Sequence, residues 1–136
     1  MKQVEAKKLK TKIKKEFHLW AEGNYIDFWT VNHILAGAVI AGVSVLSYVP
    51  LLTSVIVLFA LTITWEIYET VKNIHETTKN RIIDVIVAVI GYVLMYFVMN
   101  AEILNNVILF TIITVSFVTL NILGNMAYRK RMKRLK

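Results

Sequence analysis

Four long apolar stretches dominate the chain and constrain its fold more than any other feature. They cover approximately residues 29–49, 51–69, 82–99 and 103–126. A helix needs roughly 17–25 residues to cross the hydrocarbon of a bilayer, and backbone groups in lipid must be hydrogen-bonded within the chain. None of the stretches alternates with a period of two, which disfavours a membrane β-barrel. The sequence therefore predicts an all-α membrane protein in which four transmembrane helices form a bundle over residues 27–128.

The composition excludes the other broad classes of protein. Of the 136 residues, 57% are hydrophobic and 18% are charged, whereas soluble domains are about 45–50% apolar with about a quarter of their residues charged. A chain this apolar is neither a soluble domain nor a disordered segment. It has no Cys, which excludes disulfides, thiolate zinc sites and iron–sulfur clusters.

The basic residues gather at the two ends of the chain. Seven of the sixteen lie in the first fifteen positions, six lie in the last eight, and the remaining three are Lys72, Lys79 and Arg81. Cytoplasmic loops of membrane proteins carry an excess of Lys and Arg. We therefore expect a protein integral to the cytoplasmic membrane, with both termini and the 72–81 connection in the cytoplasm. The turns near Pro50 and Asn100–Asn105 have no basic residue and are expected outside.

The first 26 residues form a separate basic segment. Leu9, Ile13, Phe17 and Trp20 follow helical spacing and make one apolar stripe among lysines. This pattern predicts an amphipathic helix that lies on anionic lipid head groups, or alternatively a topology signal with a solvated tail. Residues 129–136 are expected to form a basic cytoplasmic tail. Since membrane topology already explains the basic ends, nucleic acid is not an expected partner.

A small set of polar residues interrupts the apolar stretches near one end of each. Its members are Asn32 and His33, Trp65, Glu66 and Glu69, Asn80, Arg81 and Asp84, and Asn121 and Asn125. Ionisable groups at membrane depth cost about 2.5–3.5 kcal/mol at a helix centre. Because the spans alternate in direction, all of these residues are expected at one depth, in the inner leaflet.

Three kinds of chemistry fit this polar layer. His33, Glu66, Glu69 and Asp84 offer one imidazole and three carboxylates, which suit a divalent cation such as zinc, manganese or iron. The same four residues are candidates for general acid–base catalysis, and Arg81 or His33 could instead neutralise the carboxylates in a structural ion-pair network. Glu69 as a solvated helix end and Asp84 as a first-turn residue favoured by the helix dipole remain alternatives. The neighbouring residues Asn32, Trp65, Asn80, Arg81, Asn121 and Asn125 are candidate ligand-binding residues.

Small residues predict where the helices pack. Gly37 with Ala41, and Ala38 with Gly42, have the spacing that lets membrane helices approach closely. In the third span, Ala88 and Gly91 share a face with Asp84. These faces are expected to point inward.

Three motifs resemble those of the VanZ-like and YjdF-like group of small membrane proteins. They are Asp27 followed by His33-x-x-x-Gly37, then Trp65-Glu66-x-x-Glu69, then Asp84 with Gly91 downstream, and the resemblance covers about residues 27–99. The group often has Asn one turn after the third-motif Asp, where this chain has Ala88. The resemblance implies a multi-span helical membrane protein with a polar inner cluster. Because one member of the group is associated with glycopeptide resistance, it also implies a link to the cell envelope or its lipids.

These patterns leave several functions open. The first is a VanZ-like protein that binds or processes an envelope lipid or a small polar ligand, as a hydrolase or transferase if it is an enzyme. The second is a non-catalytic membrane subunit or scaffold that assembles through its small-residue helix faces. The third is a small oligomeric channel or transporter. The expected partners are membrane lipids, a second copy of the chain or another membrane protein.

Overall fold

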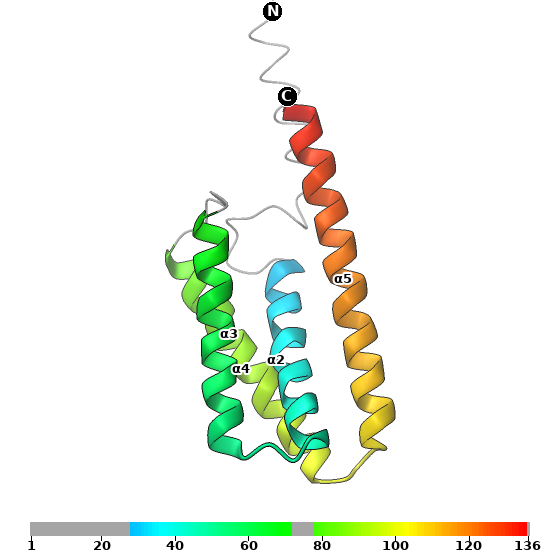
Figure 1. Cartoon of the computed structure of the whole chain (residues 1–136). Coiled ribbons are helices and arrows are strands. Elements are labelled where there is room, and N and C mark those ends of the chain that lie inside the picture. The colour runs from blue at the N-terminus through cyan, green and yellow to red at the C-terminus, as the bar shows by residue number, and fades with distance from the viewer. Residues whose placement is uncertain (1–27, 72–77, 136) are drawn as a thin grey trace, which may run out of the picture.

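The computed structural model describes residues 28–71 and 78–135, which form four helices (Figure 1). These are α2 (Phe28–Leu46), α3 (Leu51–Val71), α4 (Thr78–Asn100) and α5 (Asn106–Leu135). Each is long and apolar enough to cross a membrane, and none of the described residues is in a strand. The prediction of four apolar helices is confirmed. The predicted amphipathic helix over residues 1–26 lies outside the described residues.

Local turn chemistry moves some helix bounds away from the apolar stretches. The first helix ends at Leu46 rather than Val49, because Tyr48 takes a left-handed backbone conformation with φ of 54° and the Val49 amide donates to the Ser44 carbonyl at 2.9 Å. The last helix starts at Asn106 because the Asn105 side chain accepts hydrogen bonds from two amides of its first turn, both at 3.1 Å. At the other end α5 continues through the basic segment to Leu135.

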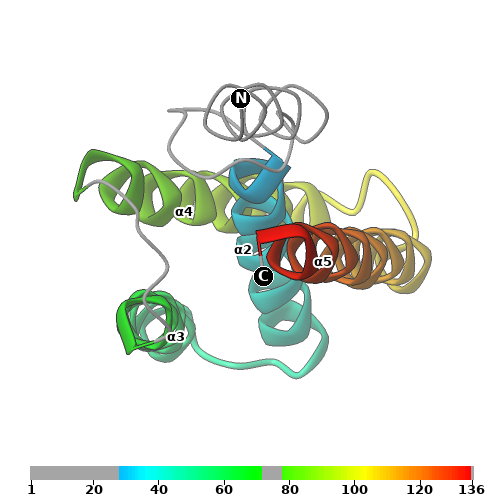
Figure 2. The same cartoon turned by 90° about the horizontal axis from the view of Figure 1, so that it is seen from above.

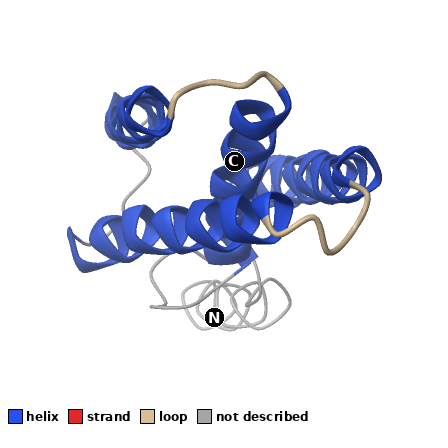
Figure 3. Ribbon diagram, turned by 90° about the horizontal axis from the view of Figure 1, so that it is seen from below, coloured by secondary structure: helices blue, strands red, loops and turns tan. Residues whose placement is uncertain are grey.

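The helices run alternately up and down. The ends of α3 and α5 lie on the same side as the starts of α2 and α4 (Figure 1). The two short connections 47–50 and 101–105 lie at the opposite end of the molecule (Figure 1), where they are separate from each other (Figure 3). This order places the polar ends of all four apolar stretches in one layer on one side of the molecule.

Helix α2 is the centre of the arrangement, and α4, α5 and α3 surround it (Figure 2). Its closest neighbour is α4. A methyl group added at Gly37 would overlap the Ala88 carbonyl group of α4, and one added at Gly91 would overlap the Ile34 carbonyl group of α2. The two backbones therefore touch directly, which only glycine permits at these two positions.

A small apolar core fills the half of the molecule away from the polar layer. Its buried members are Ala38, Ala41, Leu58, Tyr92, Met95 and Met99. Ser54 of α3 and the Tyr92 hydroxyl of α4 form a buried hydrogen bond beside this core. By contrast, most side chains of α3 and α5 are exposed. That exposure suits helices that face lipid tails.

Candidate functional site

Three of the predicted site residues converge from three different helices. His33 of α2, Glu66 of α3 and Asp84 of α4 each offer a ligand atom, and these atoms lie within 4.8 Å of one another. His33 and Glu66 are half-buried and Asp84 is buried. Each lies five or six residues from the helix end on the same side of the molecule, or about 8–9 Å at a rise of 1.5 Å per residue. We call these three residues the acidic–histidine cluster.

Two neighbouring side chains support the cluster. Asn80 precedes Asp84 by one helical turn, and its Nδ2 donates a hydrogen bond to Asp84 Oδ2 at 3.0 Å. Arg81 Nε lies 3.8 Å from Glu66 Oε2, and His33 Nε2 lies 4.0 Å from Asp84 Oδ2. Among these groups two carboxylates face one guanidinium, so the site has an excess of acidic groups that a bound cation would neutralise.

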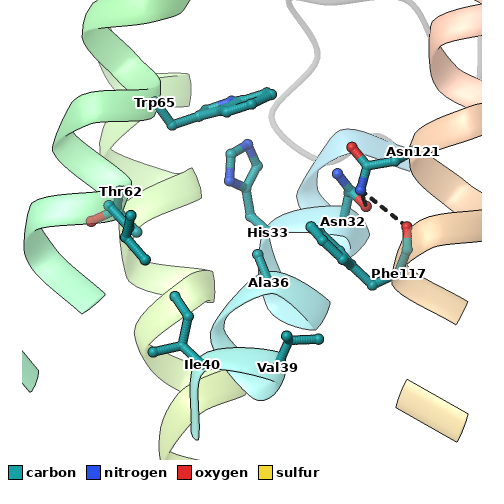
Figure 4. Close-up of a pocket in the computed structure, with 10 residues that line it drawn as sticks. Asn32, His33, Ala36, Val39, Ile40, Thr62, Trp65, Phe117 and Asn121 are labelled. Atoms are coloured by element: carbon teal, nitrogen blue, oxygen red, sulfur yellow. Dashed lines mark hydrogen bonds between the residues drawn. The ribbon is translucent and has the colours of Figure 1, made fainter. Parts of the chain in front are cut away.

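The carboxylate of Glu69 lies outside the cluster and has another partner. Trp65, one turn earlier on α3, donates its indole Nε1–H to Glu69 Oε1 at 2.7 Å, and Glu69 is buried. Figure 4 shows the Trp65 ring lying next to the His33 ring. The contact that the structure gives Glu69 therefore orients the indole rather than completing a ligand set.

An amide pair joins α2 to α5 at the same level. Asn121 Nδ2 donates to Asn32 Oδ1 at 3.0 Å and to the Phe117 carbonyl of its own helix at 3.0 Å (Figure 4). Asn125 is exposed, and its Nδ2 donates to the Asn121 carbonyl at 2.9 Å. Asn32 and Asn121 thus lie together beside the cluster, whereas Asn125 faces outward.

A groove of about 290 Å³ runs from these polar residues along α2, between α3 and α5. Its polar end is formed by Asn32, His33 and Asn121, with Trp65 beside them, and its apolar walls are Ala36, Val39, Ile40, Leu61, Thr62 and Phe117 (Figure 4). Its volume lies near the lower end of the roughly 300–1,000 Å³ of small-molecule sites. We call this feature the α3–α5 groove.

Sequence reasoning did not identify the walls of this groove. Val39, Ile40 and Leu61 are apolar residues in apolar spans, and nothing distinguishes them from residues that face lipid. A weak signal was Thr62, which lies one turn before Glu66 and faces the groove on the same side of α3.

The chain matches no protein-family model, no curated protein and no solved structure. What the cluster can do is therefore argued from its own donor set. An imidazole nitrogen and carboxylate oxygens bind zinc at about 2.0–2.2 Å in a tetrahedral arrangement, so two ligand atoms of one ion lie about 3.4 Å apart. The 4.8 Å span of the cluster needs only a small inward movement of these side chains to reach that geometry.

Proposed function

We propose that this chain is an integral membrane protein that binds a divalent cation in the acidic–histidine cluster and, through that cation, the polar head group of a membrane lipid. The observation that carries the proposal is the convergence of His33, Glu66 and Asp84 from three helices within 4.8 Å. A mixed nitrogen and oxygen donor set suits zinc, manganese or iron. Three protein ligands leave further coordination positions for water or a head-group oxygen.

The place of the cluster supports a lipid as the ligand. It lies a short distance below one end of the spans, at the depth where head groups meet the hydrocarbon. The basic ends of the chain, the 72–81 connection and the positive-inside rule favour the cytoplasmic leaflet. The chemistry open to such a site is hydrolysis or transfer at a head-group ester, for which a bound cation would polarise the carbonyl or phosphoryl oxygen. A lipid ligand agrees with the link to the cell envelope that the resemblance to VanZ-like proteins implies, whereas Ala88, where that group often has Asn, departs from the resemblance.

The test is cation analysis of the purified protein. Wild type is expected to hold one zinc or manganese ion per chain after equilibration and washing, and Glu66→Gln is expected to lose most of it. Glu69→Gln is the matched control, because it makes the same change one turn along the same helix outside the cluster. Wild type without a stoichiometric cation, or equal loss in the two variants, would refute the proposal.

The competing interpretation of the cluster is an ion-pair network that stabilises the fold. The 3.8 Å contact of Arg81 with Glu66 and the 4.0 Å contact of His33 with Asp84 favour it. A double-mutant cycle of Arg81→Gln and Glu66→Gln separates the two interpretations. An ion-pair network predicts that the effects of the two substitutions on thermal stability are strongly coupled, and that removing cations does not change this coupling. A cation site predicts that a chelator lowers the thermal stability of wild type but not that of Glu66→Gln.

A second candidate function is that of a non-catalytic membrane subunit. The exposed faces of α3 and α5 favour it, since they leave much apolar surface for partner spans. The small residues Gly37, Ala38, Ala41 and Gly42 are buried within the chain, so a partner would have to use the exposed faces of α3, α4 or α5. Wild-type protein that copurifies with a membrane partner and binds no cation would favour this function.

A further inference from the structure

We propose that the α3–α5 groove holds one aliphatic chain of a membrane lipid and places that lipid's head group at the acidic–histidine cluster. The inference rests on the proposed function and names the class of its substrate, a membrane amphiphile with an acyl or similar chain. The groove and the cluster share His33, so an occupant of one meets the other.

The polarity of the groove changes along its length in the way that an amphiphile requires. Asn32, His33 and Asn121 mark its polar end, and Ala36, Val39 and Ile40 continue along α2 as apolar walls. From His33 to Ile40 is seven residues, or about 10 Å along the helix axis. Because α2 starts on the polar side and runs toward the apolar core, the apolar part of the groove points toward the bilayer centre, as the chain of a lipid does.

The size and the surroundings of the groove decide between occupants. A volume of about 290 Å³ gives room for one chain segment and not for a helix of about 10 Å diameter. The groove lies between two helices that face lipid, so the molecules that can reach it from the side are lipids. At the polar end, the net acidic cluster with a bound cation complements a phosphate or carboxyl head group.

The experiment uses the full chain in phosphatidylcholine vesicles that contain a phosphatidylglycerol with a photoactivatable diazirine in its acyl chain. After illumination, mass spectrometry locates the labelled residues. Ala36→Trp fills the groove, and Ala60→Trp is the matched control, because Ala60 is exposed and lies next to the groove residue Leu61 on α3 without lining it. Bound manganese, measured on the same samples, reports whether each variant keeps its fold and its cluster.

We expect wild type and Ala60→Trp to be labelled preferentially at Ile40, Leu61 and Phe117. In Ala36→Trp the labelling of these residues is expected to fall by about tenfold, equivalent to about 1.4 kcal/mol, while the bound manganese is retained. Equal labelling of the groove in Ala36→Trp and wild type, or no preference for the groove over the exposed residues of α3, would overturn the inference and leave the cation site intact. Selective labelling of the groove without bound manganese would support the chain site and refute the proposed function.

Discussion

The substitution Gly37→Ala tests whether the direct contact between α2 and α4 positions the acidic–histidine cluster. The added methyl would lie 2.8 Å from the Ala88 carbonyl carbon and 3.0 Å from the Tyr92 backbone nitrogen, and closer still to the Ala88 carbonyl oxygen. All three are backbone atoms of α4, so no side chain can rotate away. The helices themselves have to move apart.

The structure gives the size of this effect. Carbon atoms pack at about 3.5–4.0 Å, so the contact with the Ala88 carbonyl carbon alone requires α2 and α4 to separate by about 1 Å, and the closer carbonyl oxygen requires more. Overpacking of this kind costs about 1–3 kcal/mol, against about 1 kcal/mol gained from the higher helix propensity of Ala. His33 lies one turn before Gly37, and Asp84 one turn before Ala88, so the separation also lengthens the 4.0 Å contact between His33 Nε2 and Asp84 Oδ2. We expect manganese affinity to fall by about tenfold, equivalent to about 1.4 kcal/mol.

The assay is a manganese titration together with thermal unfolding in detergent. Gly42→Ala is the control, since its added methyl would meet the Phe110 ring of α5, a side chain that can shift, nine residues from His33. It is expected to change both quantities little. Gly91→Ala should resemble Gly37→Ala, and the effect of the double variant should be smaller than the sum of the two, because both methyl groups push apart the same pair of helices. If Gly37→Ala binds manganese with the affinity of wild type and unfolds at the same temperature, the reasoning is refuted.

Three further substitutions probe contacts around the site. Asn32→Leu removes the amide pair between α2 and α5 and should lower the free energy of unfolding by about 0.6–2 kcal/mol. Asn125 donates to a carbonyl of its own helix, so Asn125→Leu should change the free energy of unfolding little. Equal losses in the two variants would contradict this. Tyr92→Phe removes the hydrogen bond to α3 and should lower the free energy of unfolding by about 1 kcal/mol while the manganese affinity stays unchanged. A weakened affinity would contradict the expectation that the apolar core and the acidic–histidine cluster are independent. Glu69→Leu should shift the emission of Trp65, measured with the other two tryptophans replaced by Phe, and an unchanged spectrum would mean that the carboxylate does not orient the indole.

The depth of the polar residues could be predicted from the sequence, but their rotation about the helix axes could not. His33, Glu66 and Asp84 lie in one layer because span order alone fixes their height. Glu66 and Glu69 are only three residues apart on α3, about 60° around the helix, and the only sequence signal that separated them was the place of Glu69 at the end of the apolar stretch. The choice depends on how α3 is turned toward α2 and α4, which the packing of Leu58 and Ser54 determines.

The same distinction applies to the fold. The four helices and the small-residue faces around Gly37 and Gly91 follow from composition and spacing, because close approach in lipid depends on small residues. The ends of the helices could not be predicted from hydropathy, because they depend on the conformation and hydrogen bonds of single residues. Tyr48 ends α2 in a left-handed conformation that few non-glycine residues adopt, and Asn105 starts α5 by capping amides that would otherwise have no partner in the helix.

The cluster and the groove follow from one asymmetry in the packing. Two of the three donors, His33 and Asp84, belong to helices whose backbones touch at Gly37 and Gly91, so their separation is held rigidly. The third, Glu66, belongs to α3, whose buried residues are only Ser54, Leu58 and Glu69. Similar glycine contacts between α3 and α2 would bring Glu66 closer to His33 and Asp84. They would also close the space between α3 and α5. A third helix with few buried residues would therefore give the proposed cation site an adjustable ligand and leave the α3–α5 groove open at the side.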